Sequence, residues 1–296
     1  MKIMLCPCAD KKESFVLYQS DKKNNKNNEI DVRCTSETHN KPTLYKCKKC
    51  NLIFSEYLNF NFEEAYTNVK DEKYIQQIPF KKYFDLFYSK IKSFLNKNHK
   101  VLEIGSYYGV LGNIIKSHVK NYTGLELSKH AAEYSRKNFM LNITNEPLNK
   151  FFQKNILFDV IIMNDVIEHL DNPFEALNLI EKNLGPNGIL IFTTLNMDSI
   201  VPKIMRSKYH WIMPMHKYYF SNSTLRYFLK ANNLDIFKIK SDTKLVSVEY
   251  LLFKLCILIP KIDFIFKFLL KFNFIKKITT KVNLFDLNIY FAKKIK

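Results

Sequence analysis

The chain has 296 residues, long enough for one large domain and a smaller one. Its 47% hydrophobic and 25% charged residues exclude a disordered protein, and its 15% aromatic residues can supply a substantial core. The net charge of +18 would suit nucleic acid, anionic lipid or a phosphorylated substrate. Lys and Asn are enriched together, as in residues 22–28, and no nucleic-acid motif accompanies them. We therefore attribute most of the charge to composition and expect no nucleic-acid partner.

Residues 1–65 are predicted to form a small cysteine-rich module. Five of the six cysteines lie in the first 50 residues, and the start turns polar too soon for a secretory signal, so we expect a cytoplasmic protein with reduced thiols. Cys47 and Cys50 have zinc-ligand spacing, and Cys6 with Cys8 forms a shorter second pair. We predict a structural zinc held by these four cysteines. A decayed site without metal is the alternative.

Residues 66–296 are predicted to form an α/β domain. Apolar residues at helical spacing predict a helix over 73–97. After it, strands are predicted at 100–105, 121–127, 157–164, 189–196, 234–240 and 283–294, and helices at 109–119, 129–139, 171–184 and 223–233, with a turn at 185–188. This alternation indicates a mostly parallel sheet covered by helices on both faces.

An insertion is predicted at about 245–280, before the last strand. Residues 249–277 are very apolar, but Lys254, Asp263 and further lysines interrupt any span long enough to cross a membrane. We expect helices packed on the domain as a lid. The alternative is a peripheral contact with the inner face of an anionic membrane, with the lysines reaching the headgroups.

The stretch 101–109 (VLEIGSYYG) predicts a cofactor-binding turn. It follows a strand, and ligands of open parallel sheets bind where such strands end. Gly105 and Gly109 permit a tight turn, although Tyr107 stands where a third small residue is expected. Glu126 follows Glu103 at the distance of the acid that holds ribose hydroxyls in related folds.

Three further motifs extend this pattern. They are DVIEHLDNP at 165–173, LGPNG at 184–188 and HKYYFS at 216–221. With the glycine turn, they resemble the class I S-adenosylmethionine (SAM)-dependent methyltransferases, and in particular a bacterial branch with an N-terminal cysteine module. The resemblance implies a Rossmann-like fold with a mostly parallel seven-stranded sheet, and SAM as the cofactor.

The resemblance also implies roles for individual residues. The methionine part of SAM is assigned to the first-strand acid and the turn, the ribose to the second acid, and the adenine to the residues after the second and third strands. The loop after the fourth strand is assigned to the methionine end. In this order the cofactor-binding residues are Glu103, Gly105, Ser106, Gly109, Glu126, Leu127, Asn145, Asn164 and Asp165. Asn145 replaces the acid that the family usually has there.

His169 is the predicted catalytic base, because His titrates near neutral pH and a hydroxyl or acidic carbon must lose a proton. The alternative is that Glu168 and His169 only brace loops. Quinone O-methyltransferases carry a similar Glu-His pair, which leaves open a metal-assisted role for Glu168. Trp211, His216 and Tyr218 are predicted on the substrate side, with a core role as their alternative.

The predicted function is methyl transfer to a small-molecule or sugar-type acceptor, such as an envelope polysaccharide or a lipid-linked precursor. The alternative is a non-catalytic SAM- or nucleotide-binding protein that uses zinc and basic charge for interactions. An RNA methyltransferase is disfavoured, because the loop after the fourth strand reads NDVIEH rather than an Asn-Pro-Pro-Tyr-type sequence.

Overall fold

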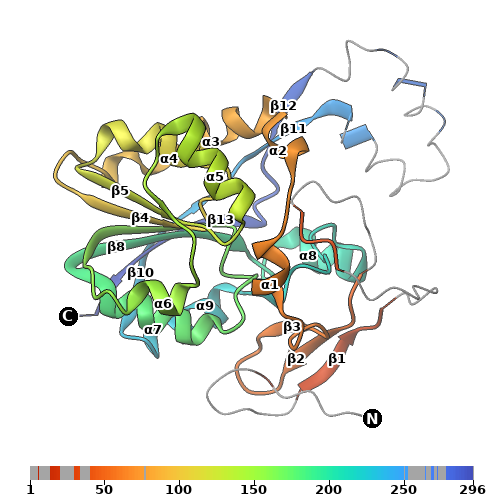
Figure 1. Cartoon of the computed structure of the whole chain (residues 1–296). Coiled ribbons are helices and arrows are strands. Elements are labelled where there is room, and N and C mark those ends of the chain that lie inside the picture. The colour runs from red at the N-terminus through yellow and green to blue at the C-terminus, as the bar shows by residue number, and fades with distance from the viewer. Residues whose placement is uncertain are drawn as a thin grey trace.

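The computed structural model describes residues 6, 14–20, 30–33, 41–76, 78–249, 251–252, 264, 268–269, 272 and 278–295. Within these ranges the chain forms a large central sheet with helices on both faces and a smaller sheet to one side of it (Figure 1).

The central sheet has seven strands in the order β10-β13-β8-β7-β4-β5-β6. Strands β6, β5, β4, β7 and β8 run parallel, and β13 and β10 are antiparallel to their neighbours. Strand order reverses between β4 and β7, which places the expected ligand site beyond their carboxyl ends. The strands are β4 Lys100–Ile104, β5 Asn121–Leu125, β6 Ile143–Thr144, β7 Phe158–Asn164, β8 Leu184–Leu195, β10 Leu234–Ser241 and β13 Leu287–Lys294.

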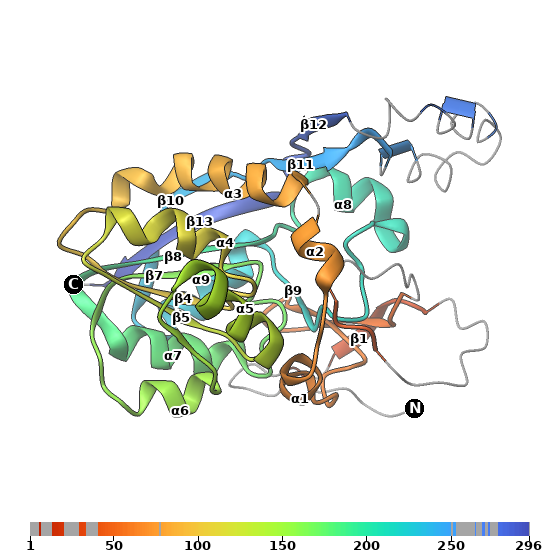
Figure 2. The ribbon, with the colours of Figure 1, turned by 45° about the horizontal axis from the view of Figure 1, so that its top comes forward.

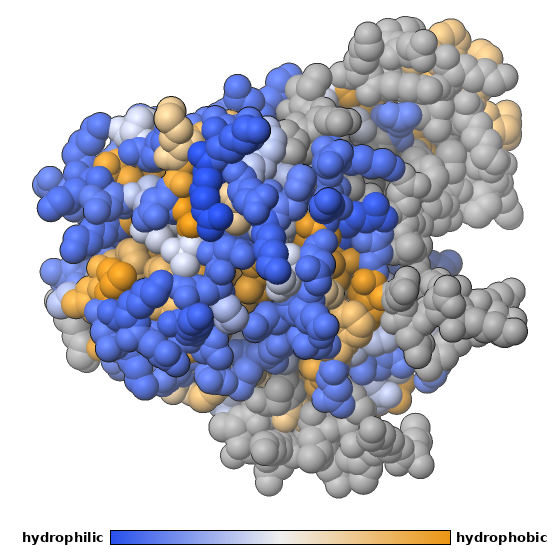
Figure 3. Space-filling view, in the orientation of Figure 1, coloured by the Kyte–Doolittle hydropathy of each residue, from blue (hydrophilic) through white to orange (hydrophobic). Residues whose placement is uncertain are grey.

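Helices cover both faces of this sheet. Helices α3, α4 and α5 lie on one face, and α6, α7 and α9 on the other (Figure 1). The helices are α3 Ile78–Ile91, α4 Val110–Ile115, α5 Lys129–Phe139, α6 Leu148–Phe152, α7 Pro173–Asn183 and α9 Asn222–Lys230, with short 3-10 turns η1 Lys92–Phe94 and η2 Lys116–His118. The face seen in Figure 3 is largely hydrophilic over these helices, as expected when each helix turns its apolar stripe inward.

Local sequence explains where these helices begin. Ser128 accepts a hydrogen bond from the Ala131 N–H at the start of α5, and Asn172 caps α7 ahead of a proline at its first position. The predicted helices and strands of this domain are confirmed with small changes in their bounds, except that the single helix predicted over 73–97 is two helices, at 72–76 and 78–91, and the turn η1. The turn predicted at 185–188 differs, because it lies within β8. The pairing with β7 jumps from Leu184 to Ile189, so these four residues bulge out of the ladder.

The smaller sheet is antiparallel, in the order β1-β2-β3-β9. Its first three strands are β1 Ser14–Tyr18, β2 Leu44–Cys47 and β3 Ile53–Ser55, and its fourth is β9 Tyr218–Tyr219 from the HKYYFS motif. Cys47, Leu52 and Phe54 share one hydrophobic core with the helices of the larger sheet. The small sheet therefore contains residues from both sides of the boundary predicted at residue 65. The division of the chain into two domains at this residue stays a prediction.

A connecting segment leads from the small sheet to α3. It contains α1 Phe62–Thr67 and α2 Glu72–Gln76 and passes over the end of the central sheet (Figure 2). The Tyr108 hydroxyl accepts the Asp71 N–H at 3.0 Å, and the Ser128 hydroxyl donates to the Val69 carbonyl at 2.9 Å. These two bonds fix the segment directly over the turn that follows β4.

The base of the predicted insertion is β structure. Strand β11 Lys244–Ser247 pairs with β12 Thr279–Val282, so the predicted insertion begins and ends in a two-stranded sheet. Helical residues are described at 248–249, 251–252, 264 and 268–269, and most of 249–277 lies outside the described residues. Helix α8 Ile200–Met205 and the turn η3 Arg206–Lys208 follow β8 along the chain. Within the described parts of the chain, no helix is long and apolar enough to cross a membrane.

Candidate active site

The glycine turn closes directly after β4. Gly105 and Gly109 have φ of +73° and +71°, in the region that side chains rarely adopt. A Cβ added to Gly105 would lie 2.6 Å from Cγ2 of Val166. Val166 follows β7, so Gly105 allows the turn after β4 to touch the loop after β7. This contact spans the point where strand order reverses.

Tyr107 also has a positive φ, of 46°, and its ring packs among other tyrosines. Its centroid lies 4.6 Å from those of Tyr74 in α2 and Tyr108, both in edge-to-face arrangements. The turn therefore tolerates tyrosine in place of a small residue at position 107, because the side chain packs against the connecting segment.

Glu126 links the turn to the end of β5. Its buried carboxylate accepts the N–H of Tyr107 at 2.6 Å and that of Ser128 at 2.7 Å. Burial raises its pKa to about 7, against the lowering effect of these backbone hydrogen bonds. Two carboxylate oxygens offer about four acceptor positions, so Glu126 can also accept a ligand hydroxyl beside these backbone N–H groups.

Asn145 supports the same region from the loop after β6. Its side-chain amide donates to the carbonyls of Glu126 and Leu127, each at 2.7 Å. The amide thus braces the backbone where the resemblance places the adenine. Ser106 is buried in the turn itself, next to Gly105.

Glu103 faces the opposite side of β4 from the apolar Leu102. Its buried carboxylate accepts the Tyr122 hydroxyl at 2.5 Å, and burial raises its pKa to about 8. A Cβ on Gly112 of α4 would lie 2.3 Å from that hydroxyl, so this glycine makes room for the pair. The sequence patterns did not predict that Tyr122 takes up the Glu103 carboxylate.

A polar network occupies the carboxyl end of β7. Asp165 pairs with Lys244 at 2.5 Å and accepts the Thr193 hydroxyl at 2.6 Å. The Tyr83 hydroxyl lies 3.0 Å from the side-chain oxygen of Asn164 and accepts Lys244 at 2.9 Å. Burial opposes ionisation of Asp165, yet Lys244 and Thr193 together lower its pKa.

Lys244 and Tyr83 are residues that the sequence analysis missed. Lys244 starts β11, and it also lies 3.5 Å from Asp242. Through Lys244, the first strand of the insertion is therefore ion-paired with Asp165, which is predicted to lie at the methionine end of SAM. A lysine in an isolated stretch before an apolar segment gives no signal for this pairing.

The loop after β7 brings together three side chains from two distant motifs. Glu168, His169 and His216 each offer a ligand atom, and these atoms all lie within 4.8 Å of one another. The two imidazole rings are 4.8 Å apart between centroids. Burial lowers the pKa of His169 to about 4 and that of His216 to about 3, so both are neutral at physiological pH. The sequence placed His169 and His216 in separate roles, whereas the fold makes them neighbours.

Hydrogen bonds set the tautomer of both histidines. Nδ1 of His169 lies 2.9 Å from the Met215 carbonyl, and Nδ1 of His216 lies 3.0 Å from the Trp211 carbonyl. A carbonyl only accepts, so each Nδ1 carries the proton and each Nε2 keeps its lone pair. The Tyr66 hydroxyl of α1 lies 3.1 Å from Nδ1 of His169 as well.

The other predicted substrate-side residues lie at different depths. Tyr218 is 1% exposed, and its hydroxyl donates to the Asp171 carbonyl at 2.8 Å. This burial favours a structural role. Trp211 is half-buried, and its ring lies 5.2 Å from that of His210.

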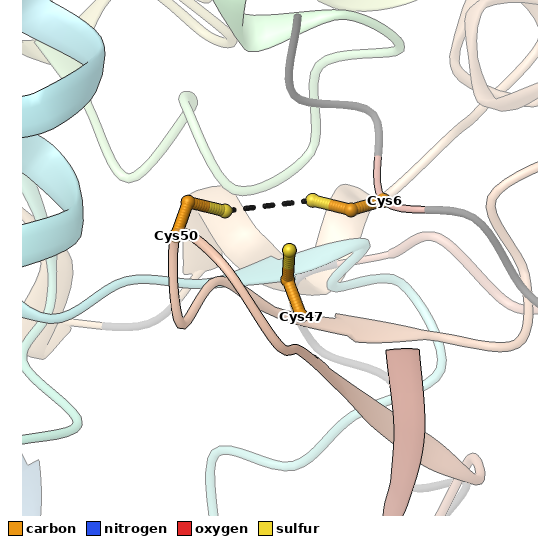
Figure 4. A group of neighbouring side chains, drawn as sticks. All are labelled: Cys6, Cys47 and Cys50. Carbon is orange, nitrogen blue, oxygen red and sulfur yellow. Dashed lines mark hydrogen bonds between the residues drawn. The ribbon is translucent and has the colours of Figure 1, made fainter. Parts of the chain in front are cut away.

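The cysteine cluster lies at the turn between β2 and β3 of the small sheet (Figure 4). Cys6, Cys47 and Cys50 are buried, and their sulfur atoms lie within 4.8 Å of one another. The Cys6 and Cys50 sulfurs are 3.6 Å apart, and Cys47 Sγ accepts the Lys49 N–H at 3.4 Å. Cys8, the fourth predicted ligand, lies outside the described residues.

Comparison with known proteins decides the family. A family model described as a methyltransferase domain matches residues 76–239, which is more than half of the chain. The chain belongs to the class I SAM-dependent methyltransferase family. A solved SAM-dependent methyltransferase from Thermotoga maritima, described as a possible histamine N-methyltransferase, is similar in fold, with a TM-score of 0.50 at 14% identity over 81% of this chain and 98% of that one. The predicted fold class is thereby confirmed.

Two curated methyltransferases are similar to part of this chain. The ubiquinone biosynthesis O-methyltransferase of Actinobacillus pleuropneumoniae serotype 7 (strain AP76) is 25% identical over 107 residues, covering 33% of this chain and 46% of the relative. The malonyl-[acyl-carrier protein] O-methyltransferase of Halalkalibacterium halodurans is 31% identical over 86 residues, covering 25% and 30%. The chain thus spans about half, or less, of the length of these relatives.

The residues present fit SAM. The two positive-φ glycines keep side chains out of the turn, and Glu126 retains acceptor positions beside it. Asp165 and Asn164 also lie at this end of the sheet, where their oxygens already bond to Lys244, Thr193 and Tyr83. Both acids and both glycines of the family pattern therefore meet around one end of the sheet.

Proposed function

We propose that this protein transfers the methyl group of SAM to a hydroxyl oxygen of a small-molecule or sugar-type acceptor. The observation that carries the proposal is the convergence of His169, His216 and Glu168 directly after β7, beside Asn164 and Asp165. Oxygen as the methylated atom is supported by the two curated relatives, whose names are both those of O-methyltransferases.

When bound, SAM supplies an electrophilic methyl group on a positively charged sulfur. Glu126 would hold the ribose hydroxyls, Asn145 and Leu127 would border the adenine, and the turn from Gly105 to Gly109 would pass close to the methionine part. Asn164 and Asp165 would orient the ammonium. These contacts hold the cofactor in one geometry, which is the main requirement for an in-line displacement.

His169 is assigned to the acceptor side. Its protonated Nδ1 is held by the Met215 carbonyl, so the free lone pair of Nε2 is the atom available to an acceptor hydroxyl. Tyr66 and the small sheet would complete that side of the site, because Lys217 and Tyr218 donate backbone N–H groups to the Glu168 carbonyl at 2.9 and 3.1 Å.

The cysteine cluster is assigned a structural zinc. Tetrahedral zinc with Zn–S bonds of ~2.3 Å separates its sulfurs by about 3.8 Å. The 3.6 Å between Cys6 and Cys50 matches that spacing. A backbone N–H donated to Cys47 also suits a thiolate ligand. Cys8 would be the fourth ligand.

The acceptor is assigned by chemical class, as a hydroxylated small molecule, a nucleotide sugar or a lipid-linked glycan. The membrane alternative for 249–277 is kept with it, because a lipid-linked acceptor would be presented at a membrane surface. Phe264 and Phe268, which are described within this stretch, are 65% and 57% exposed, as a membrane-facing segment requires.

Calorimetric titration of the zinc-replete chain with SAM tests the proposal. We expect micromolar binding that Glu126→Gln weakens by at least tenfold, since the amide cannot accept at both of its terminal atoms. Glu133→Gln, on the exposed face of α5, is the matched control and retains binding. Transfer of a labelled methyl group to nucleotide sugars and phenolic acceptors follows. A folded protein that does not bind SAM would support the non-catalytic alternative.

A further inference from the structure

Lys244 brings a positive charge from the insertion to the end of the central sheet. It is the first residue of β11, and its side chain is 18% exposed. Its ammonium nitrogen lies 2.5 Å from Oδ2 of Asp165, 2.9 Å from the Tyr83 hydroxyl and 3.5 Å from Oδ2 of Asp242. Three oxygen atoms thus surround an ammonium that has three N–H donors.

The Asp165 carboxylate is fixed from its other side by β8. Thr193 accepts the Asp165 N–H at 2.7 Å and donates its hydroxyl to Oδ1 of Asp165 at 2.6 Å. The backbone of Asp165 has a φ of +54°, which is uncommon for a residue other than glycine and is found mainly at functional sites. Because Oδ1 is bonded to Thr193, Oδ2 is the oxygen that faces a cation, and it is the oxygen that Lys244 contacts.

The same carboxylate is proposed to orient the ammonium of SAM. The side-chain nitrogen of Lys244 and the amino acid nitrogen of SAM are chemically alike, because each is a primary ammonium with three N–H donors. Two such groups beside one carboxylate repel each other, and the repulsion is strong where the site is partly buried. Lys244 therefore lies where the ammonium of the cofactor has to bind.

A second carboxylate offers Lys244 another partner. Asp242 comes two residues earlier, its side chain is fully buried, and its Oδ2 is the oxygen 3.5 Å from the lysine. Its Oδ1 pairs with Lys90 of α3 at 3.1 Å, which keeps the carboxylate in place. The Tyr83 hydroxyl, with its single hydrogen, lies 3.0 Å from both Oδ2 of Asp242 and the side-chain oxygen of Asn164. Lys244 can therefore leave Asp165 and still have a carboxylate partner.

We propose that Lys244 competes with the ammonium of SAM for Asp165 and changes its partner to Asp242 when SAM binds. The competition rests on the proposed position of SAM. Lys244 begins β11 and is paired with Val282 of β12, so its change of partner moves the two-stranded sheet at the base of the insertion. Lys244 is thus a positioning residue that couples binding of the cofactor to the position of β11 and β12.

Calorimetric titration of the zinc-replete full chain with two ligands tests the competition. S-adenosylhomocysteine has the amino acid ammonium, whereas methylthioadenosine has the same adenosine and sulfur but no amino acid part. If Lys244 holds Asp165 about 90% of the time, it raises the Kd for S-adenosylhomocysteine about tenfold. Lys244→Met removes the ammonium but keeps an unbranched side chain, so this Kd is expected to fall about tenfold, with no change in the Kd for methylthioadenosine.

Two further variants and one measurement on the wild type complete the test. Lys244→Arg keeps a cation opposite Asp165 and is expected to restore the wild-type Kd. Lys281→Met, at an exposed position of β12, is the matched control and changes neither Kd. Hydrogen exchange of the wild-type chain does not depend on any variant being folded. The amides of β11 and β12 are expected to change their exchange rates with S-adenosylhomocysteine but not with methylthioadenosine.

Two results would overturn the competition. One is a Lys244→Met variant that binds S-adenosylhomocysteine no more tightly than the wild type, because the lysine then does not compete with the ligand. The other is identical exchange in β11 and β12 with the two ligands. Both results leave binding of the cofactor, and with it the proposed function, intact. A wild-type chain that binds neither ligand would count against the proposed function and would remove the competition with it.

Discussion

The contact between Gly105 and Val166 allows a quantitative test of the geometry. Gly105→Ala combines two costs. Alanine at φ +73° loses about 1–2 kcal/mol relative to an unstrained conformation. Its Cβ would also lie 2.6 Å from Val166 Cγ2, and overpacking of this kind costs about 1–3 kcal/mol. The free energy of unfolding is therefore expected to fall by about 2–5 kcal/mol.

Val166→Ala separates the two costs. It removes Cγ2, so Gly105→Ala in that background retains the backbone strain but not the collision. The double variant is expected to be more stable than the sum of the two single effects by about 1–3 kcal/mol. Urea unfolding followed by circular dichroism measures all four free energies. Gly185→Ala is the matched control, because its added Cβ would meet nothing closer than 3.4 Å and its φ is not positive.

Additive effects, within about 0.5 kcal/mol, would refute the reasoning. They would mean that the turn after β4 and the loop after β7 do not touch at these two residues. The same variants connect stability to the site, since this contact lies between the turn and the motif that contains Asp165. Gly105→Ala should therefore also weaken SAM binding, whereas Gly185→Ala should not.

Three further predictions follow from single contacts. Between the ordinary pKa of 4.5 and its raised value of about 8, folded Glu103 holds a proton that the unfolded chain has lost, so stability falls as the pH rises through this range. Glu103→Gln, still an acceptor for Tyr122, should flatten that fall in urea titrations at pH 5 and 9, and an unchanged slope would contradict this. Asn145→Ala removes two hydrogen bonds to backbone carbonyls and should raise the calorimetric Kd for SAM about tenfold, with Asn138→Ala on α5 as the control. Cys47→Ser should abolish an elemental signal of one zinc per chain and lower the Tm, whereas Cys256→Ser, at the one cysteine outside the first 50 residues, should retain the zinc. Zinc that remains in Cys47→Ser would disprove the cluster.

The alternation of elements could be predicted from sequence because each helix carries its own signals. The cap at Asn172, the proline after it and the apolar stripe are all local, so the bounds of α7 followed from them. The glycine turn and the two acids likewise stand at fixed distances along the chain. These local patterns led to the predicted family and fold, and comparison with known proteins confirms both.

What could not be predicted depends on contacts between distant segments. Nothing in the sequence around Tyr218 indicates that it forms a strand that pairs with β3 of the small sheet. Lys244 stands beside an apolar stretch, yet it neutralises an acid 79 residues away. Neither residue has a local partner that would indicate its role, because the partner is supplied only when the sheet is assembled. The same reasoning explains why His216 was assigned separately from His169.

Backbone pairing connects the small sheet to the loop after β7, which we propose lies on the acceptor side of the site. Strand β9 pairs with β3, which pairs with β2, the strand that ends at Cys47. His216 comes two residues before β9. The backbone N–H groups of Lys217 and Tyr218 both donate to the Glu168 carbonyl. A displaced β9 would therefore move His216 and Glu168 together. The cysteine cluster can therefore influence the proposed acceptor side, because the position of β9 depends on the small sheet being folded.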